Sequence, residues 1–230
     1  MRARFIGVAL LGALLVATAG AATIATAPTI DITLNGETVG FTLGFNEDGK
    51  TFTGAGETGS YMWTYSGNTD PLINWGFTAS TPGLYHVVFF LPVIGGPYNT
   101  LKNQASVTIS DIGIGASTSS ITGTTIRGEV PAGNNIAGVA LAGNTAAPNG
   151  GFGFLPYGPA TMVQNYGNPG SMAVVLDFTF TSADNDGTAA FAGQLNLTAS
   201  AVPEPATFSM LGLALVGLGL AGRRLALRNS

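Results

Sequence analysis

Four large aromatic side chains at strand spacing are the residues of this sequence best suited to hold a ligand. Tyr61, Trp63 and Tyr65 alternate along one short segment, and Trp75 follows in the next segment after a turn. Alternation places the first three rings on one face of a strand. If that face meets solvent, the rings can stack against sugars. Large aromatic rings are also common core residues, so a sugar-stacking platform and a packed core both remain open, and the core is favoured.

Acidic side chains could support glycoside hydrolysis or calcium binding, but the sequence contains no motif for either. Two carboxylates about 5–10 Å apart across a cleft could hydrolyse a glycoside, but Glu37 and Asp48 are typical of the acids here, which stand in or beside turns. Asp184 and Asp186 are weak calcium candidates, because no acid follows in Thr188 to Leu197 to complete a binding loop. Asp and Asn in such turns also bond their own backbone. We therefore expect no metal site and no cofactor.

Nucleophilic catalysis finds little support in the sequence. The chain has one histidine, His86, and no cysteine, which excludes disulfides, cysteine metal sites and thiol catalysis. His86 lies inside the apolar run Leu84 to Ile94 without a nucleophile motif nearby. A zinc site also needs three or four ligands, and one histidine without cysteine could supply only one of the usual ones. The sequence thus predicts that the protein is not an enzyme. The Gly- and Pro-rich stretch 157–170 is a second candidate place for recognition.

Alternating apolar residues and turn signals predict strands through most of the chain. Asn35-Gly36 and the turn from Asp184 to Gly187 each predict a hairpin. The continuous apolar run Leu84 to Ile94 predicts a central strand covered on both faces. Gly133 to Gly170 is rich in Gly, Asn, Ala and Pro, and we expect mostly loop there, with one weak strand at Ile136 to Leu141. The expected strands are otherwise 30–34, 38–45, 51–53, 61–65, 72–77, 84–94, 105–110, 121–130, 172–181 and 189–198.

Eight to ten strands with turns every 8–12 residues predict an all-β fold. The favoured architecture is an antiparallel β-sandwich of the jelly-roll or immunoglobulin-like kind. A single domain of this size can bury its own core. We expect it to occupy residues 22–202.

The first 21 residues have the pattern of a signal peptide. Arg2 and Arg4 precede the apolar run Phe5 to Val16, and Ala19-Gly20-Ala21 supplies small residues for cleavage. Residues 1–21 are therefore predicted to direct export.

The region between the two ends of the chain is acidic and sparsely charged. Residues 22–202 contain three basic and eleven acidic side chains, a formal net charge of −8. Nucleic acids and anionic membrane surfaces require clustered Lys or Arg. We expect neither as a partner of this region.

The last 28 residues combine a rigid triplet, an apolar span and a basic end. Pro203-Glu204-Pro205 precedes 17 uncharged residues, 206–222, and Arg223, Arg224 and Arg228 follow. At about 1.5 Å per residue the uncharged span makes a helix of roughly 26 Å, close to the hydrocarbon thickness of about 30 Å. Positive charge marks the cytoplasmic side of a membrane helix. We predict a transmembrane helix at 206–222 with the bulk of the chain outside.

This tail, 203–230, resembles the PEP-CTERM sorting signal of bacteria that make exopolysaccharide. In that family the tail holds the protein in the inner membrane, and the membrane-embedded cysteine protease exosortase cuts at or near the triplet. The resemblance implies that Pro203, Glu204 and Pro205 are the recognised residues and that the terminal arginines form the cytoplasmic anchor. It implies exosortase and the membrane as partners, and a transient inner-membrane anchor before the cell surface or extracellular matrix. It covers the tail alone.

Together these features predict an exported bacterial surface or matrix protein, a non-enzymatic structural component associated with exopolysaccharide or biofilm. The alternative is a carbohydrate-binding β-sandwich module, which requires exposed Trp63 or Trp75. A glycoside hydrolase ranks third.

Overall fold

The computed structural model describes residues 27–112, 118–132, 135–148 and 150–199. The predicted signal peptide, the Pro203-Glu204-Pro205 triplet, the span 206–222 and the arginines Arg223, Arg224 and Arg228 lie outside these residues. Within them the ordered elements are strands, and no helix has the length and apolar character needed to cross a membrane.

Thirteen strands occupy the described residues, more than the eight to ten expected. They are β1 (Thr29–Leu34), β2 (Glu37–Thr42), β3 (Thr51–Glu57), β4 (Tyr61–Asn68), β5 (Leu72–Ala79), β6 (Gly83–Pro92), β7 (Tyr98–Asp111), β8 (Ser119–Ala132), β9 (Asn135–Ala142), β10 (Thr145–Ala147), β11 (Phe152–Gly167), β12 (Ser171–Ser182) and β13 (Gly187–Thr198).

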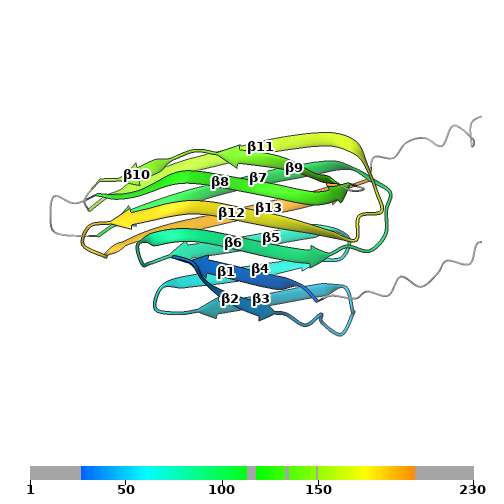
Figure 1. Ribbon diagram of the computed structural model, residues 1–230, viewed down its shortest axis with the longest axis horizontal. Coiled ribbons are helices and arrows are strands. Elements are labelled where there is room, and N and C mark those ends of the chain that lie inside the picture. The colour runs from blue at the N-terminus through cyan, green and yellow to red at the C-terminus, as the bar shows by residue number, and fades with distance from the viewer. Residues whose placement is uncertain (1–26, 113–117, 133–134, 149, 200–230) are drawn as a thin grey trace, which may run out of the picture.

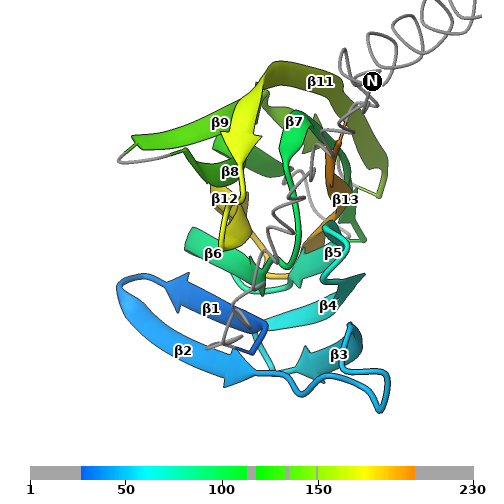
Figure 2. The ribbon, with the colours of Figure 1, turned by 90° about the vertical axis from the view of Figure 1, so that its right-hand side faces the viewer.

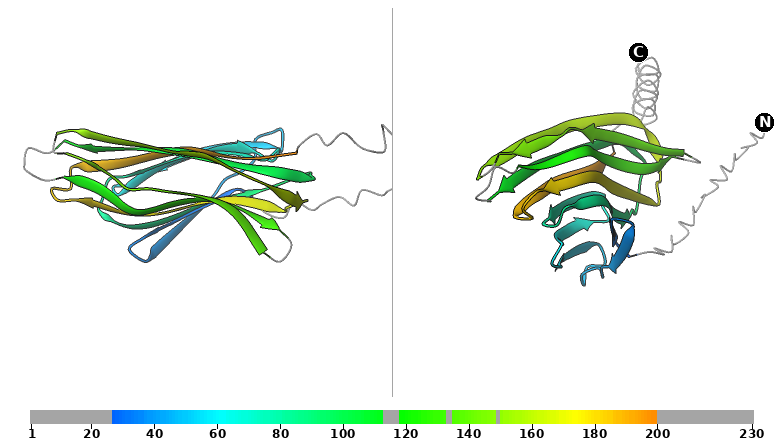
Figure 3. Two further views of the ribbon diagram at one scale, coloured as in Figure 1. Left: turned by 90° about the horizontal axis from the view of Figure 1, so that it is seen from above. Right: turned by 60° about the vertical axis from the view of Figure 1, so that its left-hand side comes forward.

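The strands form two antiparallel sheets that face each other (Figure 1). Sheet A has the order β10-β8-β12-β6-β1-β2, with β9 also paired to β8, and sheet B has the order β11-β7-β13-β5-β4-β3. Figure 2, which looks along the strands, shows the two layers side by side. Figure 3 shows their twist. The predicted all-β, sandwich-like fold is confirmed for the described residues.

The core fills the space between the sheets because every second residue of each strand points inward. In β6, Tyr85, Val87, Phe89 and Leu91 are all fully buried. Rings from the two layers meet in the middle: the ring centroid of Phe178 in sheet A lies 4.6 Å from that of Phe191 in sheet B. Contacts of this kind hold the layers at a fixed separation, and they leave the opposite face of each strand for solvent or ligand.

Both predicted hairpins are confirmed. Asn35 and Gly36 have φ values of 51° and 93°, and they connect β1 to β2 with Leu34 opposite Glu37. Asn185, with φ of 56°, lies in the turn between β12 and β13. Positive φ at these positions is the reason that Asn and Gly are favoured there.

The prediction that the run 84–94 is covered on both faces is wrong. The strand β6 alternates between buried and more exposed positions, and His86 on its outer face is exposed. Sheet A has a single neighbouring layer, so the outer side chains of β6 meet solvent. The apolar residues Val88 and Phe90 on that face made the sequence run continuous, and both are only partly buried.

The prediction of loop for most of 133–170 is also wrong. This stretch holds β9, β10 and β11, and β11 is the longest strand of the protein at 16 residues. Its Gly and Pro residues are tolerated because β11 is an edge strand of sheet B, where a missing N–H can face away from the ladder. The register shifts between Tyr157 and Ala160, and Gly158 there has a φ of 79°.

Candidate functional site

The four aromatic residues predicted to stack sugars lie in the core. Tyr61, Trp63, Tyr65 and Trp75 are exposed by only 6%, 5%, 1% and 4%. Their outward neighbours in the strands are small or polar residues and Met62. A ring at these exposures has no free face for a ligand, so the sugar-stacking hypothesis is wrong for these residues.

Glycines explain how the core accommodates the two indoles. A Cβ at Gly56 would lie 2.6 Å from the ring of Trp63, and a Cβ at Gly193 would lie 2.5 Å from the ring of Trp75. Each indole thus packs against the backbone of a neighbouring strand. The hydroxyl of Tyr65 donates to the carbonyl of Phe90 at 2.7 Å, which ties sheet B to sheet A. The four aromatic side chains therefore stabilise the core and join the two sheets.

The calcium candidates Asp184 and Asp186 lie in the turn between β12 and β13. In that turn the amide of Gly187 donates to Ser182 Oγ at 3.1 Å, which is the local bonding expected of a tight connection. Among the described residues, no group of three His, Cys, Asp or Glu side chains is arranged to hold a metal ion. The turn supplies two acids without a third ligand of these types.

The single histidine belongs to an ion-pair row on the outer face of sheet A. His86 Nδ1 lies 2.6 Å from Asp177 Oδ1, and Arg127 Nη2 lies 3.1 Å from Asp177 Oδ2. Arg127 Nε lies 3.1 Å from Glu129 Oε1. The side chains of His86 and Arg127 are 47% and 43% exposed, so solvent screens these charges.

This row lacks the nucleophile that a catalytic histidine requires. Thr33 stands opposite His86 on β1, but its hydroxyl is hydrogen-bonded to that of Thr38 at 2.7 Å. The hydroxyl of Thr125 lies 3.4 Å from Asp177 Oδ2, whereas His86 is bonded to the other carboxylate oxygen, Oδ1. The geometry fits a surface ion-pair network better than a triad.

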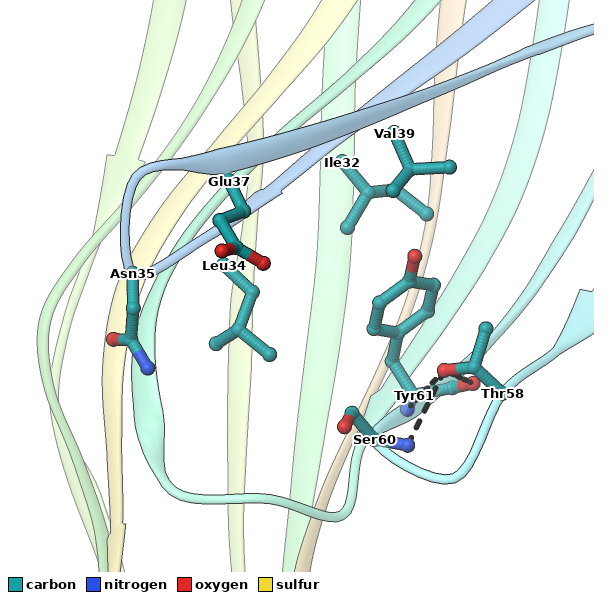
Figure 4. A pocket seen from close by; sticks show the side chains of 8 residues that line it. All are labelled: Ile32, Leu34, Asn35, Glu37, Val39, Thr58, Ser60 and Tyr61. Atoms are coloured by element: carbon teal, nitrogen blue, oxygen red, sulfur yellow. Dashed lines mark hydrogen bonds between the residues drawn. The ribbon is translucent and has the colours of Figure 1, made fainter.

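A groove opens at the corner of the sandwich between the β1–β2 hairpin and the β3–β4 turn (Figure 4). Its volume is about 490 Å³. Val39 pairs with the buried Ile32 and points to the same side, yet it is 47% exposed, because sheet B does not cover it. Figure 4 shows the Tyr61 hydroxyl directed into the groove toward Ile32 and Val39.

The ionisable groups that line this groove are the carboxylate of Glu37 and the phenol of Tyr61. A phenol ionises near pH 10 and burial raises the pKa of Tyr61 further, so this group is a neutral hydrogen-bond donor and acceptor at neutral pH. The turn below is fixed by Thr58, whose hydroxyl accepts hydrogen bonds from the amides of Ser60 and Tyr61 at 3.2 Å. The lining of the groove holds no second carboxylate and no cation, so it lacks the paired groups of a hydrolase.

Two exposed rings that sequence reasoning missed lie on β11. Phe152 and Phe154 are 75% and 63% exposed, and both lie on the outer face of sheet B. Their spacing of two residues is that of one face of a strand, but the surrounding Gly and Pro residues favoured a loop. In the other recognition stretch, 157–170, the rings of Tyr157 and Tyr166 are buried.

Comparison with known proteins identifies the tail. The PEP-CTERM protein-sorting motif matches residues 201–228. The chain therefore ends in a sorting signal of exported proteins that associates with the membrane. A search of curated protein sequences found no match.

One similar solved structure is described as the structural basis for the promiscuous specificity of carbohydrate-binding modules from the β-sandwich superfamily. It is 11% identical to this chain, 74% of each chain is covered, and the TM-score is 0.24. A likeness at this TM-score supports no conclusion about the ligand of the present protein.

Proposed function

We propose that this protein is a non-enzymatic component of the bacterial cell envelope or extracellular matrix that is sorted by exosortase and associates with exopolysaccharide. The observation that carries the proposal is the PEP-CTERM motif at 201–228. In this account the N-terminal 21 residues direct export, and the uncharged span 206–222 then anchors the chain in the inner membrane. Exosortase recognises Pro203, Glu204 and Pro205.

The position of the motif fits processing that leaves the sandwich whole. The last strand, β13, ends at Thr198, and its partners β5 and β7 lie earlier in the chain. A cut at or near Pro203 therefore removes no strand of either sheet. The released product retains the complete core that the two sheets enclose.

A structural rather than catalytic role is supported by the chemistry of the described residues. Among the described residues no hydroxyl is hydrogen-bonded to the imidazole of His86, and the groove beside Tyr61 offers a single carboxylate. Most of the eleven acids of residues 22–202 are dispersed over turns and outer strand faces. A polar surface with few charges suits a protein embedded in a hydrated polysaccharide matrix.

The test replaces the sorting triplet in the native host. Substitution of Pro203, Glu204 and Pro205 by alanine should trap the full-length protein in the inner membrane and remove it from the matrix fraction. The matched control is Asn229→Ala with Ser230→Ala, two positions beyond the matched motif, which should leave the distribution unchanged. Equal amounts of wild-type and triplet variant in the matrix would contradict the proposal.

A further inference from the structure

The outer face of sheet B carries a patch of uncharged side chains where the edge strand β11 pairs with β7. The pairing of β11 with β7 places Phe152 opposite Ser110, Phe154 opposite Thr108 and Pro156 opposite Ser106. Paired residues share a face, and the intervening residues of β7, Val107 and Ile109, are fully buried in the core. The two phenylalanines, the proline and the three hydroxyl residues therefore all point outward. We call this surface the β11 face.

The two phenylalanine rings are placed for stacking. They are separated by one residue, so they stand on the same side of the strand about 7 Å apart along it. Exposures of 75% for Phe152 and 63% for Phe154 leave a ring face of each accessible. Exposed aromatic groups next to each other on a soluble protein mark an interaction site more often than isolated apolar residues do. An aromatic face accepts the C–H groups of a sugar ring.

A shallow depression lies next to the rings and is lined by amides and small residues. Its volume is about 440 Å³, and its walls include Gln104, Ser106, Pro156 and Gln194. The amide of Gln194 donates to Asn74 Oδ1 at 2.9 Å, which holds the side chain across the sheet surface. Amide groups supply both donors and acceptors. A hydroxyl-rich ligand beside the rings would find matching hydrogen-bond partners here.

Charge selects the class of ligand. Residues 22–202 contain eleven acids and three bases, yet the six outward residues of β7 and β11 that define the β11 face are all uncharged. The nearest charge on this face is Lys102, which is exposed on β7 two residues from Gln104 and four from Ser106. Glu57 lies on β3 at the opposite edge of the sheet. A surface without charge offers no partner to an anionic ligand and imposes no desolvation cost on an uncharged one.

We propose that the β11 face binds an uncharged polysaccharide chain, with sugar rings stacked on Phe152 and Phe154 and sugar hydroxyls bonded to Gln104 and Gln194. This inference rests on the proposed matrix function and gives it a binding site. The binding strand is the edge of the sheet, so a long chain can lie across the surface without meeting a wall. In this proposal the sugar-binding site is the β11 face, not the buried rings of Tyr61, Trp63, Tyr65 and Trp75.

The test uses the full-length protein in mild detergent and insoluble uncharged polysaccharides, namely cellulose, curdlan and chitin. Wild type should be retained on at least one of them and not on alginate, an anionic polymer. Phe152→Ala with Phe154→Ala should lower the retention constant at least tenfold. The matched control is Leu84→Ala, which removes an apolar side chain of 60% exposure from the outer face of sheet A and should bind like wild type.

A second variant separates binding from folding. Thr108 is exposed opposite Phe154 on the β11 face. Thr108→Lys places a charge there and should abolish retention, and the circular dichroism spectrum should remain that of the folded protein. The proposal would be overturned if wild type were retained on none of the three polymers. It would also be overturned if the double phenylalanine variant were retained as strongly as wild type. Concentration-dependent dimers that the double variant loses, without polysaccharide retention, would instead identify an interface between two copies.

The sorting proposal and this inference fail separately. A protein whose tail is never processed can still be retained on polysaccharide, which would refute the sorting mechanism alone. A protein that is processed normally and ignores all three polymers would refute the binding site alone.

Discussion

Replacement of Phe178 by alanine tests the central packing of the sandwich. Phe178 is 1% exposed and joins the two sheets: its ring lies 4.9 Å from Tyr85 in sheet A and 4.6 Å from Phe191 in sheet B. Loss of a buried Phe side chain costs about 3–5 kcal/mol, and aromatic pairs add about 0.5–1.5 kcal/mol each beyond burial. These contributions overlap, so we expect a loss of about 4–5 kcal/mol, which lowers the folding equilibrium constant by roughly one thousand to several thousandfold.

Urea denaturation of the full-length protein in mild detergent measures this loss. Both tryptophans of the chain, Trp63 and Trp75, lie in the core, so their fluorescence follows unfolding of the sandwich. Phe178→Leu keeps most of the apolar volume and should cost roughly 1–2 kcal/mol. The matched control Phe154→Ala removes an exposed ring and should change stability by less than about 0.5 kcal/mol. Similar losses for Phe178→Ala and Phe154→Ala would refute the assignment of core and surface.

Three further predictions concern polar groups. Burial raises the pKa of Tyr85 to about 12; since the unfolded phenol ionises near pH 10, unfolding releases a proton between these values. Stability should therefore fall from about pH 10 to 12, and Tyr85→Phe should reduce that slope in urea midpoints measured against pH. Asn103 is fully buried and its amide donates to the carbonyls of Ile126 and Val139 in sheet A at 3.2 Å, so Asn103→Ala should cost about 1–3 kcal/mol in the same denaturation assay; no loss would contradict its role as a tie between the sheets. His86→Gln should change stability by less than about 1 kcal/mol because the ion-pair row is exposed; a larger loss would indicate a structural role for the imidazole.

Local signals in the sequence were sufficient for the hairpins and for the fold class. Asn35-Gly36 specifies a turn through its backbone conformation, and that conformation needs no information about distant residues. Alternation likewise indicated the strand around Tyr61, and the continuous apolar run indicated the strand that begins near Leu84. What alternation leaves undetermined is which face of a strand meets the other sheet. From the sequence, Trp63 and Trp75 therefore fitted either a favoured core position or a sugar-binding surface. The pairing of the strands shows that both rings are buried in the core.

Edge position was the second missing piece of information. Pro156 and Gly158 weaken a strand within a sheet interior, and by local rules they predict a loop. Because β11 lies at the edge of sheet B and pairs only with β7, the chain tolerates both residues together with the register shift. The exposed pair Phe152 and Phe154 follows from that pairing. Non-local contacts therefore determined the candidate binding surface.

The most direct test of the account is the intact mass of the protein recovered from its native host, with and without exosortase. We predict a mature chain in the matrix that begins near Ala22 and ends between Val202 and Pro205, and a chain extending to Ser230 in membranes of the exosortase deletion. A chain that ends at Ser230 and stays in the membrane in both strains would contradict the account, because the tail would then serve as an anchor without processing.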